Sequence, residues 1–146
     1  MAGNQMPKFD NDSPDRVRAN SSETINRELD EEAELRIRGL AGKSREEMTN
    51  RIGELNREWD MERVLQTNAS ILALTGVFLG VTASRKFLFL PGVVFGFLVQ
   101  HAVQGWCPPM PLFRHWKVRT RKEINREKYA LKALGGDFDA VTPPNL

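Results

Sequence analysis

The sequence predicts an all-α membrane protein, an antiparallel transmembrane hairpin of two helices flanked by cytoplasmic amphipathic helices. Two observations predict this fold class, the segregation of charge along the chain and the length of its apolar centre. Residues 64–106 contain two of the 21 lysines and arginines and none of the 19 acidic residues. A chain that is charged at both ends and nearly free of charge in its middle is typical of a protein inserted in a bilayer.

The apolar centre divides into two segments, Val64–Ala83 and Phe87–Trp106, each of 20 residues. A helix crosses the hydrocarbon core with about 20 residues, and a chain in lipid must satisfy its own backbone hydrogen bonds, so both segments are predicted to be helices. The residues between them, Ser84–Lys86, allow only a tight turn, which predicts an antiparallel pair. The alternative is a buried hairpin in a soluble protein, but the flanking segments are too short to cover two wholly apolar helices.

The lysines and arginines near the two segments predict the orientation in the membrane. Four of them precede the first segment within 20 residues and six follow the second within 20 residues, against only Arg85 and Lys86 in the turn. The positive-inside rule therefore places both termini in the cytoplasm. Five of the basic residues after the second segment are expected to contact anionic lipid headgroups: Arg114, Lys117, Arg119, Arg121 and Lys122. No aromatic platform or fold motif accompanies them, so nucleic acid is not expected as a partner.

Each apolar segment contains two glycines four residues apart, Gly76 and Gly80 in "GVFLG" and Gly92 and Gly96 in "GVVFG". Glycines with this spacing form a flat helix face that lets two backbones approach closely. Counted from the turn, Gly80 and Gly92 lie at similar depth, and so do Gly76 and Gly96. We therefore expect the two faces to meet within the hairpin. Contact with another copy of the chain is the alternative for these faces, and a homo-oligomer is expected.

Residues 22–63 are predicted to form cytoplasmic amphipathic helices. Ser44 and Glu47 fit a capping box, so one helix is expected to start near Arg45 and to run on into the membrane. Apolar residues recur at helical spacing on both sides of a break at Gly39–Gly42. The two stripes are formed by Ile25, Leu29, Ala33, Ile37 and Leu40, and by Met48, Ile52, Leu55 and Trp59.

The two ends of the chain give simpler predictions. Residues 1–21 are polar and are expected to be a disordered tail. Residues 107–146 are expected to form a cytoplasmic basic segment and one helix that ends at Gly135–Gly136. The apolar stripe of that helix contains Ile124, Leu131 and Leu134.

Three stretches frame the apolar centre: "REWDMERVL" before the first segment, and "QGWCPPMPLF" and "VRTR" after the second. Between Trp59 and Thr120 the sequence thereby resembles the YgaP-like transmembrane domain family of bacterial inner-membrane proteins. The resemblance implies two spans in the bacterial inner membrane and no settled function. A rhodanese domain can be fused to such a hairpin, but the 63 leading residues contain no cysteine. Rhodanese activity is therefore not implied for this chain.

The only cysteine of the chain, Cys107, follows the second segment in the stretch "GWCPP". Prolines cannot continue a helix, so the second helix is expected to end near Trp106 and to leave Cys107 at the level of the cytoplasmic headgroups. Gln100, Gln104 and Cys107 share a helix face, with His101 alongside. Because polar groups at membrane depth usually face protein or water, we expect a small polar pocket in front of the cysteine.

Three interpretations of Cys107 remain open from the sequence. It is a small residue at a helix end, in which case the polar side chains of the second helix bond across to Gln66, Thr67 or Asn68. It is a reactive thiol whose pKa is lowered by Arg114 and His115. It belongs to a metal site, which a dimer would have to complete, because one cysteine and one histidine cannot fill a tetrahedral shell.

Taken together, these features predict a small membrane-anchored interaction or scaffold module that uses no cofactor or metal. The helix-packing residues are expected to be Gly76, Gly80, Gly92 and Gly96. The alternative function is that of a thiol-based sulfur-handling or redox partner acting through Cys107. In that case the neighbouring groups are His101, Gln104, Arg114 and His115.

Overall fold

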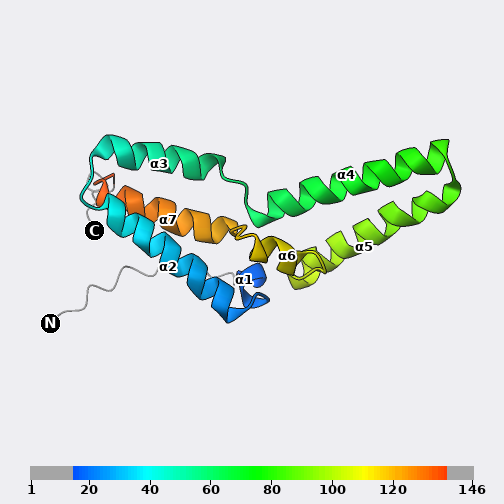
Figure 1. Cartoon of the computed structure of the whole chain (residues 1–146), viewed down its shortest axis with the longest axis horizontal. Helices are drawn as coiled ribbons and strands as arrows, with labels where there is room; N and C mark the ends of the chain where they lie inside the picture. Colours follow the sequence, from blue (N-terminus) through cyan, green and yellow to red (C-terminus); the bar gives the residue numbers. More distant parts are fainter. Residues whose placement is uncertain (1–14, 138–146) are drawn as a thin grey trace, which may run out of the picture.

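The computed structural model describes residues 15–137, and every regular element in that range is helical. The expected tail of residues 1–14 lies outside the described residues. Figure 1 shows two regions, in which α2, α3 and α7 lie together at one end and α4 and α5 extend away from them. The elements are α1 (Arg16–Ala19), α2 (Glu23–Leu40), α3 (Arg45–Arg57), α4 (Met61–Thr82), the 3-10 helix η1 (Arg85–Leu88), α5 (Phe89–Gln104), α6 (Met110–His115) and α7 (Arg121–Leu134).

The helical bundle of α2, α3 and α7 has a small apolar core. Helix α7 packs against both α2 and α3. Capping boxes begin two of the three helices, Ser44 with Glu47 at α3, as predicted, and Thr120 with Glu123 at α7. The exposed Leu134 lies outside the core, although it belongs to the predicted stripe. The core contains Ile37 from α2, Leu55 from α3, and Ile124 and Leu131 from α7.

The apolar pair, α4 and α5, lies side by side along most of its length (Figure 1). Two helical segments, one ending at Thr82 and one over Arg85–Gln104, are long and apolar enough to cross a membrane. Only 28% and 11% of their most apolar windows are buried within the chain. Large apolar side chains such as Phe78, Val81 and Phe89 are 67–79% exposed. The pair therefore has an apolar surface that the rest of the described chain does not cover.

The helix expected to run from Arg45 into the membrane is interrupted, which corrects the prediction. Helix α3 ends at Arg57 and α4 begins at Met61. Asp60 caps α4 by accepting a hydrogen bond from the Arg63 backbone N–H at 2.9 Å. Because an N-cap residue has extended rather than helical backbone angles, Asp60 stops one helix and starts the next. The break lets the bundle pack at its own angle to the apolar pair.

The start of the described chain is also different from the prediction. Residues 15–21 were expected to belong to the disordered tail, but α1 is folded and its Val17 is buried. Asp15 caps the helix by accepting from the Arg18 backbone N–H at 3.0 Å. The helix is too short to be stable alone, so its contacts with the rest of the chain must hold it.

Candidate functional site

The junction between the two regions contains Cys107, and its surroundings are apolar. The cysteine is 3% exposed. It packs in a junction cluster, in which Val17 comes from α1, Met61 and Leu65 from α4, and Met110 and Phe113 from α6. The expected polar pocket in front of the thiol is therefore wrong. The sequence pattern did not reveal these apolar surroundings, because α1 and α6 cover the side of Cys107 that we expected to face water.

This environment stabilises the neutral thiol. Burial raises the pKa of the Cys107 thiol above its ordinary value. The expected lowering of that pKa by Arg114 and His115 is wrong, because Arg114 turns toward Glu123 and His115 is exposed. A thiolate is the reactive form of cysteine, so the closed junction disfavours thiol chemistry at neutral pH.

The end of α5 is closed by a glycine and by side chains from α1. Gly105 has a φ of +72° and lies against Arg16, where a side chain would clash. The Arg16 guanidinium donates to the backbone carbonyls of Ala102 and Val103 at 3.3 and 3.2 Å. The Asn20 side chain donates to the carbonyl of Gln104 at 3.3 Å. These bonds satisfy acceptors that a helix end otherwise leaves free.

In the described part of the chain, Gln100, His101 and Gln104 make no side-chain hydrogen bond to Gln66, Thr67 or Asn68, contrary to the expectation. Asn68 donates instead to the carbonyl of Val64 in its own helix, at 2.8 Å. The Nδ1 atom of His101 is buried and has no hydrogen-bond partner in the described part of the chain. Within residues 15–137 no group of three or more His, Cys, Asp or Glu side chains is placed to hold a metal ion.

The glycines of α4 and α5 behave differently. A Cβ atom at Gly76 would lie 2.6 Å from Cδ of Pro91, and one at Gly80 would lie 2.5 Å from Cδ2 of Leu88. A Cβ atom at Gly92 or Gly96 would meet nothing within 4 Å. Gly76 therefore lets α4 approach α5, and Gly80 lets it approach η1, whereas the expectation that Gly92 and Gly96 pack within the pair is wrong. Their depth was matched, but their faces are turned outward.

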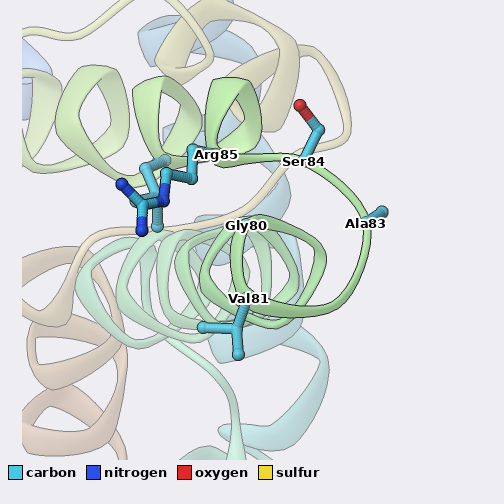
Figure 2. Close-up of a pocket in the computed structure, with 6 residues that line it drawn as sticks. Gly80, Val81, Ala83, Ser84 and Arg85 are labelled. Atoms are coloured by element: carbon cyan, nitrogen blue, oxygen red, sulfur yellow. The ribbon is translucent and has the colours of Figure 1, made fainter.

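The turn between α4 and α5 forms an open hollow. Figure 2 shows the side chain of Arg85 lying beside the helices, whereas the side chains of Val81 and Ala83 point away from Arg85. The lining of the hollow includes one cationic side chain, Arg85, and one hydroxyl group, that of Ser84, and these two groups do not form a catalytic pair. Its lining residues are Gly80, Val81, Ala83, Ser84, Arg85 and Leu88.

Two of the five basic residues expected at the lipid surface are buried. Arg114 is 1% exposed; it donates to Glu123 at 2.8 Å and to the side chain of Asn26. Arg119 is 5% exposed and pairs with Glu58 at 2.7 Å. Neither side chain faces a bilayer, so the expectation of lipid contact is wrong for both.

The other three basic residues of that set lie nearer the surface. Lys117 pairs with Glu32, and Arg121 pairs with Asp60. Both basic side chains are about half exposed. Lys122 is partly buried and makes contacts of its own. The basic segment is thus used largely to hold α7 and α6 against the rest of the chain.

A buried carboxylate that the sequence did not reveal holds the bundle together. Glu127 on α7 is 1% exposed and forms ion pairs with Arg36 at 3.3 Å, Arg51 at 3.0 Å and Arg119. Burial alone would raise the pKa of Glu127, but the hydrogen bonds and charges of these arginines outweigh it and lower the pKa. In the sequence Glu127 is one acid among many on an amphipathic helix, and no motif distinguishes it.

Comparisons with protein-family models, with characterised proteins and with solved structures found no match. The resemblance to the YgaP-like family therefore stays a prediction. The geometry of the chain itself gives a closed apolar junction, an ion-paired bundle and an uncovered apolar pair.

Proposed function

We propose that this chain is a small integral membrane protein in which α4 and α5 span a bilayer as an antiparallel hairpin. One observation carries the proposal: the segment that ends with α4 and the segment formed by η1 and α5 are each long enough to cross, yet their apolar windows are less than one third buried. A core helix of a soluble protein would be covered by its neighbours. A bilayer covers such a surface without any further protein.

The proposed location is the bacterial inner membrane, with both termini in the cytoplasm. The excess of lysine and arginine on the side of the termini supports this orientation, because the rule counts these residues even when acids neutralise them. Arg85 and Lys86 would then lie at the periplasmic headgroups, where long basic side chains reach the interface. The resemblance to the YgaP-like family agrees with this location.

The proposed role is that of a membrane-anchored interaction or scaffold module. Two features support it: the cytoplasmic helices form a stably paired bundle, and Cys107 is closed off in an apolar cluster. Lys117 and Arg121 are paired with Glu32 and Asp60, but about half of each basic side chain stays exposed and could contact anionic headgroups on the cytoplasmic face. We further propose that the outward face of Gly92 and Gly96 contacts a second copy, because such a face allows close backbone approach in lipid.

Membrane insertion is tested by expressing the full chain in bacteria and washing the membranes at alkaline pH. The protein should remain in the pellet, and reporter fusions at the C-terminus should give a cytoplasmic signal, whereas fusions at Ser84 should give a periplasmic one. Release of the protein by the wash would reject the hairpin. A periplasmic signal at the C-terminus would reject the orientation alone.

Self-association is tested separately by chemical crosslinking of the protein in its native membranes. Gly92→Leu and Gly96→Leu should reduce the dimer band, because the added side chains push the copies apart. Val81→Leu is the matched control, since Val81 is also exposed but lies on α4, away from the glycine face of α5. Equal dimer bands in all variants would show that the glycine face is not the interface.

A further inference from the structure

Helix α1 lies across the place where α5 ends, and its hold on the rest of the chain is almost wholly polar. Asp15 accepts a hydrogen bond from the Thr120 hydroxyl. Arg18 pairs with Asp30 on α2 and, at 3.1 Å, with Glu123 on α7. Val17 is the only residue of α1 that is buried. The helix therefore touches α2, α5 and α7 with one apolar side chain and several charges.

Contacts of this kind depend on salt. The Arg18 guanidinium binds Asp30 through two hydrogen bonds and both side chains are 30% exposed, while the bonds from Arg16 to the α5 carbonyls are at the surface. Ion pairs that water and ions can reach are screened by electrolyte. Segments with few buried apolar contacts open locally without unfolding of the whole protein. Helix α1 fits this description, because four residues cannot form a stable helix alone.

The surface that α1 covers is largely apolar, unlike the polar contacts that hold the helix in place. Val17 covers the junction cluster in which Cys107, Met61 and Met110 are buried. Arg16 covers the last turn of α5 and lies against Gly105. Loss of α1 would therefore uncover an apolar patch and the free carbonyls of a helix end.

We propose that α1 is a releasable strap, which closes the junction when docked and uncovers the junction cluster when it opens. Its opening is controlled by ionic strength, since Arg18 and its two acidic partners are the main charged attachment. This inference does not rest on membrane insertion, because every contact involved lies at the C-terminal end of α5 or beyond it.

The test uses the single thiol as a reporter. Full-length protein in detergent micelles is labelled with a maleimide at about pH 7.5, in about 50 mM and about 1 M salt, and each rate is normalised to that of the unfolded chain in the same buffer. In the unmodified protein the rate should rise several-fold with salt. Arg18→Ala should raise the low-salt rate about tenfold and flatten the salt response. Val17→Asp should raise the rate further, because it places a charge in the cluster.

A matched control and a second measurement separate opening from unfolding. Arg38→Ala removes an exposed ion pair with Glu34 on α2 and should leave both rates unchanged. In urea, the labelling rate of the unmodified protein should rise with a much smaller slope than the loss of helicity, since local opening exposes little surface. Equal rates in Arg18→Ala and the unmodified protein, or equal urea slopes for labelling and unfolding, would overturn the strap.

Discussion

The apolar pair and the helical bundle hold their helices together by opposite chemistry. In the pair, α4 brings Gly76 against α5 and Gly80 against Leu88 of η1, and residues 64–84 contain no charged side chain. In the bundle, Glu127 collects three arginines from the neighbouring segments above a small apolar core. Close backbone contact works where the surroundings are as apolar as the helices. Ion pairs with a specific geometry work where water can solvate the remaining charges.

The largest expected effect is in the bundle. Glu127→Gln should lower the free energy of unfolding by about 3 kcal/mol, because it removes the buried carboxylate that Arg36, Arg51 and Arg119 share. The low end of the range for a broken buried pair applies, since each arginine keeps a second acidic partner. The loss should be measured by urea unfolding followed by circular dichroism. Glu31→Gln is the control, since Glu31 forms only an exposed pair with Arg27 and its loss should change stability by less than about 0.5 kcal/mol.

The same carboxylate gives the bundle a dependence on pH. The pKa of Glu127 is lower in the folded protein than its ordinary value of 4.5, so its contribution is complete above about pH 4.5. That contribution is lost as the pH falls through the lowered pKa of the folded state. Urea midpoints between pH 7 and pH 3 should therefore fall more steeply in the unmodified protein than in Glu127→Gln. Parallel curves would show that another group dominates the acid response.

The next largest effect separates the two glycine faces of the apolar pair. Gly76→Val should destabilise the pair by about 1–3 kcal/mol, because the new side chain meets the rigid ring of Pro91. Gly92→Val adds the same atoms at an open position and should leave the pair intact. Disulfide crosslinking between cysteines introduced into α4 and α5, in a Cys107→Ala background, reports the packing. Equal loss of crosslinking in both variants would contradict the difference between the faces.

The sequence predicted what depends on local pattern. Hydropathy located α4, α5 and the turn to within a few residues, and the Ser44–Glu47 spacing located the start of α3. Charge segregation could not reveal which of the many acids and arginines are buried, because the burial of Glu127 depends on three segments that meet only in the fold. The outward orientation of Gly92 and Gly96 could not be predicted for a related reason. The spacing of the glycines fixes their depth along the helix but not which side of the helix faces α4.

The site around Cys107 shows the same limit. The prolines correctly placed the cysteine beyond the end of α5, but its exposure was misjudged because α1 comes from 90 residues earlier in the chain. Asp15 before Val17 is a signal that was available, since an acidic N-cap ahead of an apolar residue is compatible with a short helix. No local pattern indicates that such a helix docks on α5.

A third effect follows from the apolar cluster around the thiol. Cys107→Ser should be less stable than Cys107→Ala by about 1 kcal/mol, because the serine hydroxyl would be buried among apolar side chains. If Cys107 were near water, the serine variant would be as stable as the alanine variant or more stable. Urea unfolding of both variants measures it. The unmodified protein should also lose stability as the pH rises above about 9, the ordinary pKa of the thiol, toward the higher pKa that burial gives the thiol in the folded state.

The smallest effect has the opposite sign and concerns a glycine in the bundle. Gly53 lies within α3, where a Cβ atom would meet nothing within 4 Å. Glycine loses more backbone freedom than alanine when a helix forms, so Gly53→Ala should stabilise the protein by about 0.5–1 kcal/mol. Gly76→Ala in α4 gains the same entropy but must displace the Pro91 ring, so it should be destabilising. Thermal unfolding of the two variants side by side measures this contrast. If both alanines stabilise, α4 does not need its glycine, and close backbone approach cannot be what holds the apolar pair together.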